Sequence, residues 1–553
     1  MATDWEKKAA AARSKLNESI PQDWRRVIPD NHVAAIDHVA SCDLLTTREA
    51  EIIQMSATAL VADLANGRLK SAEVTIAFCK RAALAIQWTN CGHQFFPDEA
   101  LSQAKQLDEY FEKHGKPIGP LHGLPISLKD QLRIKVRNTI GHETHMGYIS
   151  WIGRIDEEDS VLTAMLRKAG AVFYVKTSVP QTLMTGETFN HIIGRTVNPR
   201  NKAWSCGGSS GGEGAMVSLR GGVIGIGTDI GGSIRIPAAF NFLYGIRPSH
   251  GRIPYGKMAN SMEGQETVHS VVGPMAHSAS DLRLLMTSVL NEQPWLYDSK
   301  VIPMPWRVHE EEAIYRKARL GNLSLAFYEN DGSVQPHPPV VRAVDMVVSC
   351  LEKAGHTVRS WQPYRHDLAV SLVGRVYVSD GHADVSHETG ASGEPLIPNV
   401  VDLFDPDLSA VNVNELWDLQ SQKWKYQMEY LQKWLEFEAT HGGELDAIIA
   451  PVAATACVRH NQYRYYGYST AINLLDWTSV VVPVTFADKD VDKAIPDYSP
   501  LNDMDGLVHK EYDAEVYHGA PVAIQVLGRR LSEEKTLAIA EEIGRLLDSS
   551  LTP

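Results

Sequence analysis

Hydrophobic residues recur at helical spacing over the early part of the chain. Within 56–113, Leu60 and Leu64 lie one turn apart, and the segment 99–113 repeats an apolar face at the same period. The preceding residues, 1–55, are polar with a helical pattern. The sequence therefore predicts a helical lead-in followed by several packed helices.

The pattern changes after residue 119, where short β-branched and apolar runs alternate with helical segments. PLHGLPISLKD, from Pro120 to Asp130, contains a short strand, 159–169 predicts a helix, and AVFYVKT at 171–177 predicts a buried strand. Further strand-like runs occupy 445–455, 479–487 and 520–528. A last helix is expected from Ser532 to about Asp548. This alternation is typical of an α/β protein.

No linker or internal repeat divides the sequence. Residues 290–420 mix proline, tryptophan and charged residues without a period, which indicates a variable, insert-like region laid over a core. We therefore expect one main domain over 56–545, preceded by the helical extension 1–55 and followed by a short tail, 546–553.

Composition narrows the class of protein. The chain has 553 residues, 44% hydrophobic and 22% charged, which is average for a folded soluble protein. Its net charge of −14 argues against general nucleic-acid binding and against an anionic membrane surface. The six cysteines form no C-x-x-C pair, which excludes a zinc ribbon and favours a reducing compartment. With no signal-peptide pattern and no apolar run of about 20 residues, a cytoplasmic location is expected.

The segment 205–235 is the most unusual part of the chain, because it contains eleven glycines. They interleave with apolar residues in VIGIG at 223–227, which indicates backbone packed closely against backbone. Its serines have three competing interpretations. They are incidental residues of a glycine-rich turn, part of a phosphate-binding loop, or catalytic nucleophiles.

The motifs separate these interpretations. No G-x-x-x-x-G-K-[ST] is present, and Ile230 stands where a dinucleotide motif needs its last glycine. GGSSG at 207–211 fits a nucleophile elbow centred on Ser209. Ser233, however, follows TDIGG, a turn in which several backbone N–H groups can point into one concavity and form an oxyanion hole. A nucleophile at Ser233 would lie beside its own oxyanion donors.

These motifs resemble those of one family. GGSSGGEG, GTDIGGSIRIPAAF and an upstream GLPISLKD, with Ser209 and Ser233 separated by 24 positions, are similar to the amidase signature family. The resemblance spans 56–545, and segments 258–275 and 303–307 are similar to its fungal acetamidase subgroup in particular. It implies a large mixed β-sheet core sheathed by helices.

The resemblance also implies residue roles. Lys129 falls on the family's general base, Ser209 on its bridging serine, which follows a cis peptide, and Ser233 on its acylated serine. The oxyanion amides fall on Ile230, Gly231, Gly232 and Ser233. Met184 falls on a position that lines the acyl site. No metal and no cofactor are expected.

Physical chemistry sets a condition on this assignment. A serine hydroxyl is a weak nucleophile until a base takes its proton, and a lysine acts as a base only when it is neutral. Burial of Lys129 in the PISLKD strand would lower its pKa. Asp130 would raise that pKa if it contacted the amine, but successive strand residues point to opposite faces. We therefore expect Asp130 to face away from Lys129.

Other residues near the motifs have structural interpretations. Asp229 and Arg235 are expected to form a buried ion pair that holds the loop, and Cys206 is expected to pack rather than react. Gln131 stands where the family often has asparagine, which affects loop detail. No histidine pair shows H-x-x-x-H spacing, so no metal site is predicted.

We expect a serine amidase that hydrolyses small carboxylic amides, acetamide-like, to carboxylate and ammonia through an acyl-enzyme on Ser233. Alternatives with the same residues are a carbamate, anilide or ester hydrolase and a fatty-amide hydrolase. An amidotransferase subunit and a scaffold that only binds ligand are less favoured. The expected partner is a small-molecule amide, without nucleic acid or membrane. The sequence leaves the oligomeric state open, with a homodimer as one candidate.

Overall fold

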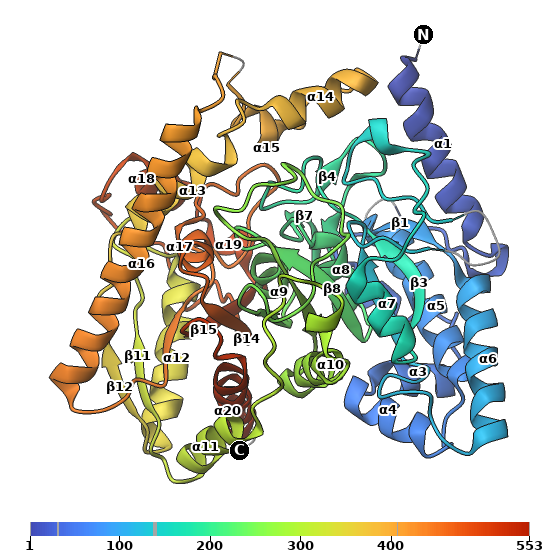
Figure 1. Cartoon of the computed structure of the whole chain (residues 1–553), viewed down its shortest axis with the longest axis horizontal. Coiled ribbons are helices and arrows are strands. Elements are labelled where there is room, and N and C mark those ends of the chain that lie inside the picture. The colour runs from blue at the N-terminus through green and yellow to red at the C-terminus, as the bar shows by residue number, and fades with distance from the viewer. Residues whose placement is uncertain (1, 30–31, 136–140, 406, 552–553) are drawn as a thin grey trace.

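A computed structural model describes residues 2–29, 32–135, 141–405 and 407–551 (Figure 1). Its centre is a mixed sheet of eleven strands. In spatial order these are β1 (Gly92–Phe95), β3 (Val172–Thr177), β2 (Pro125–Lys129), β8 (Ile224–Asp229), β10 (Val271–Ala276), β9 (Tyr244–Arg247), β14 (Thr478–Phe486), β15 (Pro521–Gly528), β13 (Ala447–Pro451), β11 (Ser324–Phe327) and β12 (Thr357–Ser360). β2 pairs in parallel with β3 and β8, β11 pairs in parallel with β12 and β13, and the other pairs are antiparallel. The expected large mixed sheet is confirmed.

Helices surround this sheet, and two small hairpins accompany it. The helices in the N-terminal half of the chain are α1 (Asp4–Ser19), α2 (Ala35–Ala40), α3 (Thr47–Gln54), α4 (Ala57–Ala65), α5 (Ser71–Thr89), α6 (Pro97–His114), α7 (Val161–Lys168), α8 (Gly211–Ser218), α9 (Arg235–Phe240) and α10 (Ala279–Asn291). Those that follow are α11 (Val308–Arg319), α12 (Pro338–Lys353), α13 (His366–Tyr377), α14 (Ala383–Ser392), α15 (Pro398–Val401), α16 (Val413–His441), α17 (Gly467–Leu475), α18 (Asp503–Lys510), α19 (Ala514–Tyr517) and α20 (Glu533–Leu551). The hairpins are β4 (Phe189–Asn190) with β5 (Gly194–Arg195), and β6 (Val197–Asn198) with β7 (Asn201–Ser205).

The predicted elements lie where the patterns put them. The runs at 171–177, 479–487 and 520–528 form β3, β14 and β15, each buried over most of its length. The helix predicted at 159–169 is α7, which begins after Ser160 rather than at Asp159. The helix predicted to end near Asp548 is α20, which continues to Leu551. The domain boundaries at residues 55 and 545 stay predictions.

Close packing between α8 and β8 explains the interleaved glycines. A Cβ atom on Gly225 would lie 2.1 Å from the Glu213 carboxylate, and one on Gly227 would lie 2.8 Å from the Ser210 hydroxyl. Real Cβ atoms do not approach other atoms so closely, so β8 needs glycine at both positions. This packing brings the start of α8, with Ser209 before it, against β8. In β8 the close neighbours are therefore side chains. A Cβ atom on Gly208 would instead lie 2.7 Å from the backbone of Glu187, and one on Gly212 would lie 2.3 Å from the backbone of Ser178, so the expected packing of backbone against backbone is found at these glycines rather than in the VIGIG run.

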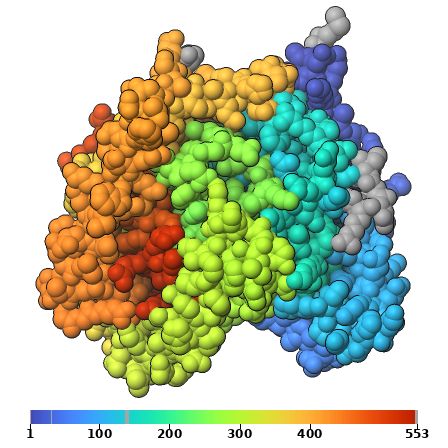
Figure 2. Space-filling view, in the orientation of Figure 1, coloured from blue at the N-terminus to red at the C-terminus, as the bar shows by residue number. Residues whose placement is uncertain are grey.

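Residues 290–420 complete one end of the sheet. They contribute β11 and β12, together with α11 to α15, and α13 contacts both α16 and α17. The region expected to be a variable layer therefore also builds part of the core. In the space-filling view the yellow to orange part of the chain also crosses the top of the molecule to meet the cyan N-terminal half (Figure 2), where Glu388 and Glu394 bond Ser150 and Ile149. Among the described residues, no helix has both the length and the apolar character needed to cross a membrane.

Candidate active site

The site forms where two parallel strands end at the same edge of the sheet. β2 and β8 are hydrogen-bonded neighbours, with Leu128 in register with Ile226. β2 ends at Lys129 and β8 ends at Asp229, so the loops that follow these two strands begin side by side. Loops at the carboxyl ends of parallel strands are common places for functional side chains in α/β proteins.

Lys129 is fully buried at this edge. Its Nζ atom lies 2.8 Å from Ser209 Oγ and 2.8 Å from Thr228 Oγ1. Burial lowers the pKa of Lys129 from its ordinary value of 10.5 to about 7, against a smaller opposing effect of the carboxylates of Asp229 and Glu213. The amine is therefore neutral in a large fraction of molecules at neutral pH, as a general base must be.

The two serine loops are tied to each other. The peptide bond between Gly208 and Ser209 is cis, as the resemblance implied. Ser210 donates its backbone N–H to the carbonyl of Ser233 (3.1 Å), and its hydroxyl bonds both backbone groups of Thr228 (3.2 Å each). Ser209 and Ser233 are buried but retain slight exposure. The structure thus holds Lys129, Ser209 and the loop of Ser233 in one network.

Thr228 contributes a contact that the sequence analysis did not identify. Its hydroxyl donates to Gln131 Oε1 (2.8 Å), and the Gln131 amide donates to the carbonyl of Ala259 (2.6 Å). A threonine hydroxyl has a single proton, so Thr228 can only accept from Lys129. One N–H of a neutral Lys129 therefore points at Thr228, which leaves the amine lone pair free to face Ser209.

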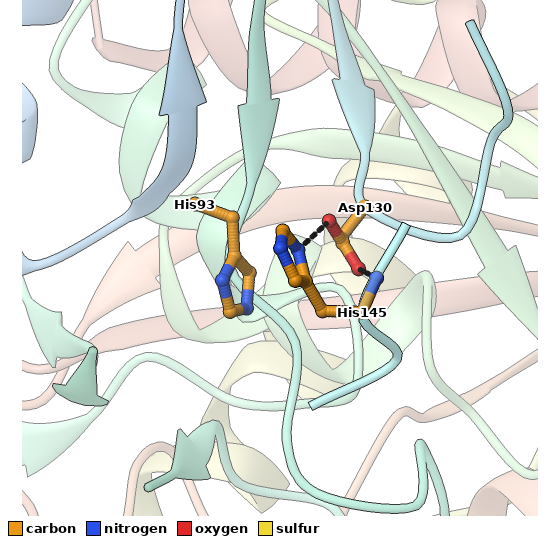
Figure 3. Close-up of side chains that lie close together, drawn as sticks. All are labelled: His93, Asp130 and His145. Carbon is orange, nitrogen blue, oxygen red and sulfur yellow. Dashed lines mark hydrogen bonds and ion pairs between the residues drawn. The ribbon is translucent and has the colours of Figure 1, made fainter. Parts of the chain in front are cut away.

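Asp130 points toward His145 (Figure 3), whereas the Lys129 amine points toward Ser209, so the two side chains diverge as expected from strand alternation. Its carboxylate accepts the backbone N–H groups of His145 (2.7 Å) and Met146 (2.8 Å), and its other oxygen lies 3.1 Å from His145 Nδ1. Burial acts to raise the pKa of Asp130, but the nearby positive charges of His145 and Lys176 outweigh it and lower that pKa. The Asp130 carboxylate is therefore charged, and it makes no hydrogen bond to Lys129, its neighbour in sequence.

The same region contains a group of potential metal ligands. Ligand atoms of His93, Asp130 and His145 all lie within 4.8 Å of one another (Figure 3). Both ring nitrogens of His145 face carboxylate oxygens, of Asp130 (3.1 Å) and Glu143 (3.3 Å). Burial, which lowers the pKa of His145, is outweighed by these carboxylates, which raise it to about 9. His145 is therefore protonated at neutral pH, and a metal ion could bind it only by displacing a ring proton. The three side chains fit a network of ion pairs better than a metal site.

The loop after β8 is held by a buried ion pair. Arg235 Nε lies 3.0 Å from Asp229 Oδ2 with both side chains fully buried, so the pair expected from the sequence is confirmed. Asp229 also accepts the backbone N–H of Gly232 (2.9 Å) and of Ile234 (3.1 Å). Gly232 has a φ of +124°, and a Cβ atom there would lie 2.6 Å from the Ser469 hydroxyl, so only glycine fits.

Three of the four predicted oxyanion donors remain available. The N–H of Gly232 is occupied by Asp229, whereas the described chain offers no hydrogen-bond partner to the N–H groups of Ile230, Gly231 and Ser233. Ile230 and Gly231 are also partly exposed, unlike the buried strand before them. Adjacent N–H groups without a partner are what an oxyanion hole requires.

Two side chains from distant helices hold the carbonyls of this loop. Tyr377, at the end of α13, donates its hydroxyl to the carbonyl of Ile230 (2.6 Å), and Ser469, in α17, donates to the carbonyl of Gly231 (2.7 Å). Because a trans peptide is planar, fixing the Ile230 carbonyl directs the Gly231 N–H to the opposite side. No motif in the sequence pointed to Tyr377.

Met184 lies in the loop that follows β3. It is half-buried, and its backbone N–H bonds the Thr182 hydroxyl (3.2 Å). In the same loop, Gly186 donates its N–H to Tyr466 Oη (2.8 Å), which anchors the loop to the start of α17. The role of Met184 in lining the acyl site stays a prediction.

Comparisons with known proteins identify the family of this chain. The model of the Amidase family matches residues 73–537. The chain is 63% identical to an acetamidase of Emericella nidulans over the whole of both chains. It is 64% identical to an acetamidase of Aspergillus oryzae, over 98% of this chain and 99% of that one. A solved structure described as fatty acid amide hydrolase is 36% identical, with a TM-score of 0.91, over 99% of this chain and 95% of that chain.

The family match covers the strands, loops and helices that carry the candidate residues. Lys129, Ser209, Thr228 and Ser233 all fall inside the matched range. The full-length similarity to the two acetamidases extends to the helical lead-in and to residues 290–420. The chain therefore belongs to the amidase family, a family of hydrolases that act on amides.

Proposed function

We propose that this amidase hydrolyses short-chain aliphatic amides, acetamide among them, through an acyl-enzyme on Ser233. The observation that carries the proposal is the 2.8 Å contact between Lys129 Nζ and Ser209 Oγ, combined with a Lys129 pKa of about 7. The preference for short acyl groups is supported by the similarity to two acetamidases at 63% and 64% identity.

In the acylation step, Ser233 Oγ attacks the amide carbon. The Ser233 proton passes to Ser209 Oγ, while the Ser209 proton passes to the neutral Lys129. Ser209 suits this relay, because a hydroxyl donates and accepts a hydrogen bond at the same time. The contact of Lys129 with Thr228 supports the transfer by keeping the amine lone pair directed at Ser209.

The tetrahedral intermediate carries a negative oxygen. We assign its stabilisation to the N–H groups of Ile230, Gly231 and Ser233. Collapse breaks the C–N bond, and the leaving nitrogen takes a proton from Ser209, which regains one from Lys129. Ammonia departs, and a water molecule then repeats the sequence on the ester bond of Ser233. The products are the carboxylate and the free enzyme.

The working context is also part of the proposal. We place the protein in the cytoplasm, supported by six free cysteines, of which Cys79, Cys91, Cys206 and Cys457 are buried. The acidic net charge of −14 supports the absence of a nucleic-acid partner. The isolated chain is expected to be active without a second kind of subunit, unlike an amidotransferase component.

A second candidate, a fatty-amide hydrolase, has its own supporting observation. The solved structure of that description has the same fold at 36% identity. One experiment distinguishes short-chain amides from fatty amides as substrates. The purified chain is given unbranched amides of increasing length, and ammonia release is measured. We expect catalytic efficiency to peak at acyl groups of about two to five carbons, since each methylene that a pocket accepts contributes about 0.8 kcal/mol and the gain stops at the wall.

The control is Ser233→Ala, which should lose activity by several orders of magnitude on every substrate. A steady increase in efficiency up to long-chain amides would favour the fatty-amide hydrolase. Faster turnover of a matched ester or carbamate would instead assign the site to that class of substrate. Activity that appeared only after addition of a second protein would contradict the free-standing enzyme.

A further inference from the structure

Glu213 is a buried acidic residue that the proposed mechanism does not use. It lies in the first turn of α8, and its side chain is fully buried. The side chain points at the sheet, because a Cβ atom on Gly225 of β8 would lie 2.1 Å from Glu213 Oε2. A charged carboxylate is costly to bury, so a buried acidic residue needs either a cationic partner or a bound proton.

Both oxygen atoms of Glu213 face hydroxyl groups on neighbouring strands. Oε1 lies 2.7 Å from Thr177 Oγ1, at the end of β3, and Oε2 is hydrogen-bonded to Ser127 Oγ in β2. Within the described part of the chain, no lysine, arginine or histidine forms an ion pair or a hydrogen bond with Glu213. The hydroxyl groups are therefore its polar partners, and neither of them carries a charge.

The two other acidic residues close to Lys129 differ from Glu213 in this respect. Asp229 is held by its buried ion pair with Arg235, and Asp130 lies among the positive charges described above. Their negative charges are therefore balanced by cations other than Lys129. A negative charge on Glu213 would have no such partner and would act on Lys129.

Glu213 and Lys129 lie in the same layer, between α8 and the sheet. Ser127 is two residues before Lys129 on β2, so the two side chains point to the same face of the strand. Thr177 is the register neighbour of Lys129 on β3. A charged Glu213 favours the protonated form of Lys129 and raises its pKa. A neutral Lys129 is what the base of the proposed mechanism requires, so a charged Glu213 opposes it.

The hydrogen bonds accommodate a protonated Glu213. A carboxylic acid has one O–H donor and one carbonyl acceptor. The O–H can donate to Ser127 Oγ, whose own proton can point at the carbonyl of Ile224 (3.5 Å), while Thr177 donates to the other oxygen. Each of the three protons then has an acceptor. Burial raises the pKa of Glu213 to about 8, although the two hydroxyl groups and Lys129 act to lower it.

The other titratable groups around α8 supply no charge to Glu213. Burial favours the neutral form of four of them at pH 7: Cys79, Cys91, Tyr174 and His277. The cations on the packed elements bond other groups: Arg81 on α5 the carbonyl of Leu219, Lys176 on β3 the hydroxyl of Thr144, and Arg235 on α9 the carboxylate of Asp229. Lys129 is thus the titratable group whose charge depends most directly on that of Glu213.

We propose that Glu213 is a positioning residue that stays a protonated carboxylic acid in the working enzyme, and that its lack of charge allows Lys129 to be neutral. The inference rests on the proposed role of Lys129 as the base, and it extends that role to a residue that touches neither substrate nor Ser233.

Infrared spectroscopy of the full chain tests the protonation of Glu213 directly. A protonated carboxyl group has a carbonyl stretching band that a carboxylate lacks. The difference between wild type and Glu213→Gln should contain this band at pH 7 and lose it by pH 9, because the acid ionises as the pH passes about 8. Glu394, whose pKa burial raises to about 7, contributes equally to both spectra.

Two further variants control this measurement. Glu533→Gln is the matched control, because Glu533 is fully buried but paired with Arg252, so its difference spectrum should contain a carboxylate band and no acid band. Thr177→Val removes a donor to Glu213 and should move the loss of the acid band upward by about one pH unit. If Glu213→Gln does not fold, wild type and Thr177→Val still decide the matter, since a band that does not move would overturn the proposal.

Kinetics test the consequence for Lys129. Glutamine is always neutral and has the donor and acceptor of a protonated acid. The rise of kcat/KM between pH 6 and pH 8 should therefore keep its midpoint in Glu213→Gln, within about 0.3 pH unit. A midpoint lower by about one unit or more would show that Glu213 carries a charge in the wild type, and it would overturn the proposal, as would the absence of the acid band at pH 7.

Failure of the proposed function would be seen separately. A Lys129→Met variant that stayed active would remove Lys129 as the base, whereas the infrared band reports the protonation of Glu213 whatever reaction the enzyme performs.

Discussion

Replacing Lys129 with methionine should abolish activity and at the same time stabilise the folded protein near neutral pH. Lys129 is fully buried, and burial lowers its pKa from 10.5 to about 7. In the unfolded chain the lysine returns to its ordinary pKa, so between pH 7 and pH 10 the unfolded state binds more protons than the folded state. That difference favours unfolding, and its effect grows as the pH falls towards 7.

The magnitude follows from the two pKa values. A pKa difference of about 3.5 at 1.36 kcal/mol per unit costs the wild-type protein about 4 kcal/mol of stability at pH 7, and about 1 kcal/mol at pH 10. Methionine has a similar length and no charge, but it loses the contacts with Ser209 and Thr228, at about 1 kcal/mol each. Lys129→Met should therefore be more stable than the wild type by about 2 kcal/mol at pH 7.

Urea unfolding of both proteins at several pH values measures this difference. The advantage of Lys129→Met should shrink by about 3 kcal/mol between pH 7 and pH 10 and reverse in sign, since the other titrating groups are common to both proteins. Lys176→Met is a control for lysine burial, because Lys176 is also fully buried but lies 3.5 Å from Asp156, so its loss should destabilise at every pH. A Lys129→Met variant that is less stable at pH 7, or whose stability difference does not change with pH, would refute the reasoning.

Three further outcomes are expected. Tyr377→Phe removes the hydrogen bond to the carbonyl of Ile230, so steady-state kinetics should show a kcat about tenfold lower with little change in KM. An unchanged kcat would show that Tyr377 does not position the oxyanion loop. The wild-type kcat/KM should rise about tenfold from pH 6 to pH 8 and then level, because the active neutral Lys129 forms as the pH passes its pKa of about 7; a climb continuing beyond pH 9 would contradict that value. Dialysis against EDTA should leave ammonia release intact, and activity restored only by zinc would instead assign a metal to the group around His145.

The sequence predicted the elements whose patterns are set by local burial. β3, β14 and β15 are buried over most of their length, so their continuous apolar runs were visible without knowledge of the fold. The glycines of β8 were also informative, because their cause, contact with Glu213 and Ser210 on α8, depends on residues close in sequence. Lys129, Ser209 and Ser233 were predicted as site residues from long motifs in the same part of the chain.

The features that the sequence did not predict depend on contacts between segments that are far apart in the chain. Tyr377 reaches Ile230 across 147 positions of sequence, and a tyrosine at the end of an ordinary helix carries no sign of such a contact. Thr228 was quoted as part of a motif, but its acceptor role appears only when Gln131 is seen to occupy its proton. The orientation of α16 could not be predicted for a different reason: Trp417 and Trp424 are exposed, whereas Trp434 and the two tyrosines Tyr426 and Tyr430 are buried. Apolar residues on both sides of the helix obscure its period, and only the fold shows which side is buried.

The assignment of Ser233 as nucleophile, with Ser209 as relay, is tested most directly by covalent labelling. A fluorophosphonate reagent reacts with an activated serine, and peptide mass spectrometry locates the adduct. The account predicts one adduct, on the peptide that carries Ser233, with labelling abolished in Ser233→Ala and strongly slowed in Lys129→Met. An adduct on Ser209, or labelling at full rate in Lys129→Met, would contradict the proposed mechanism.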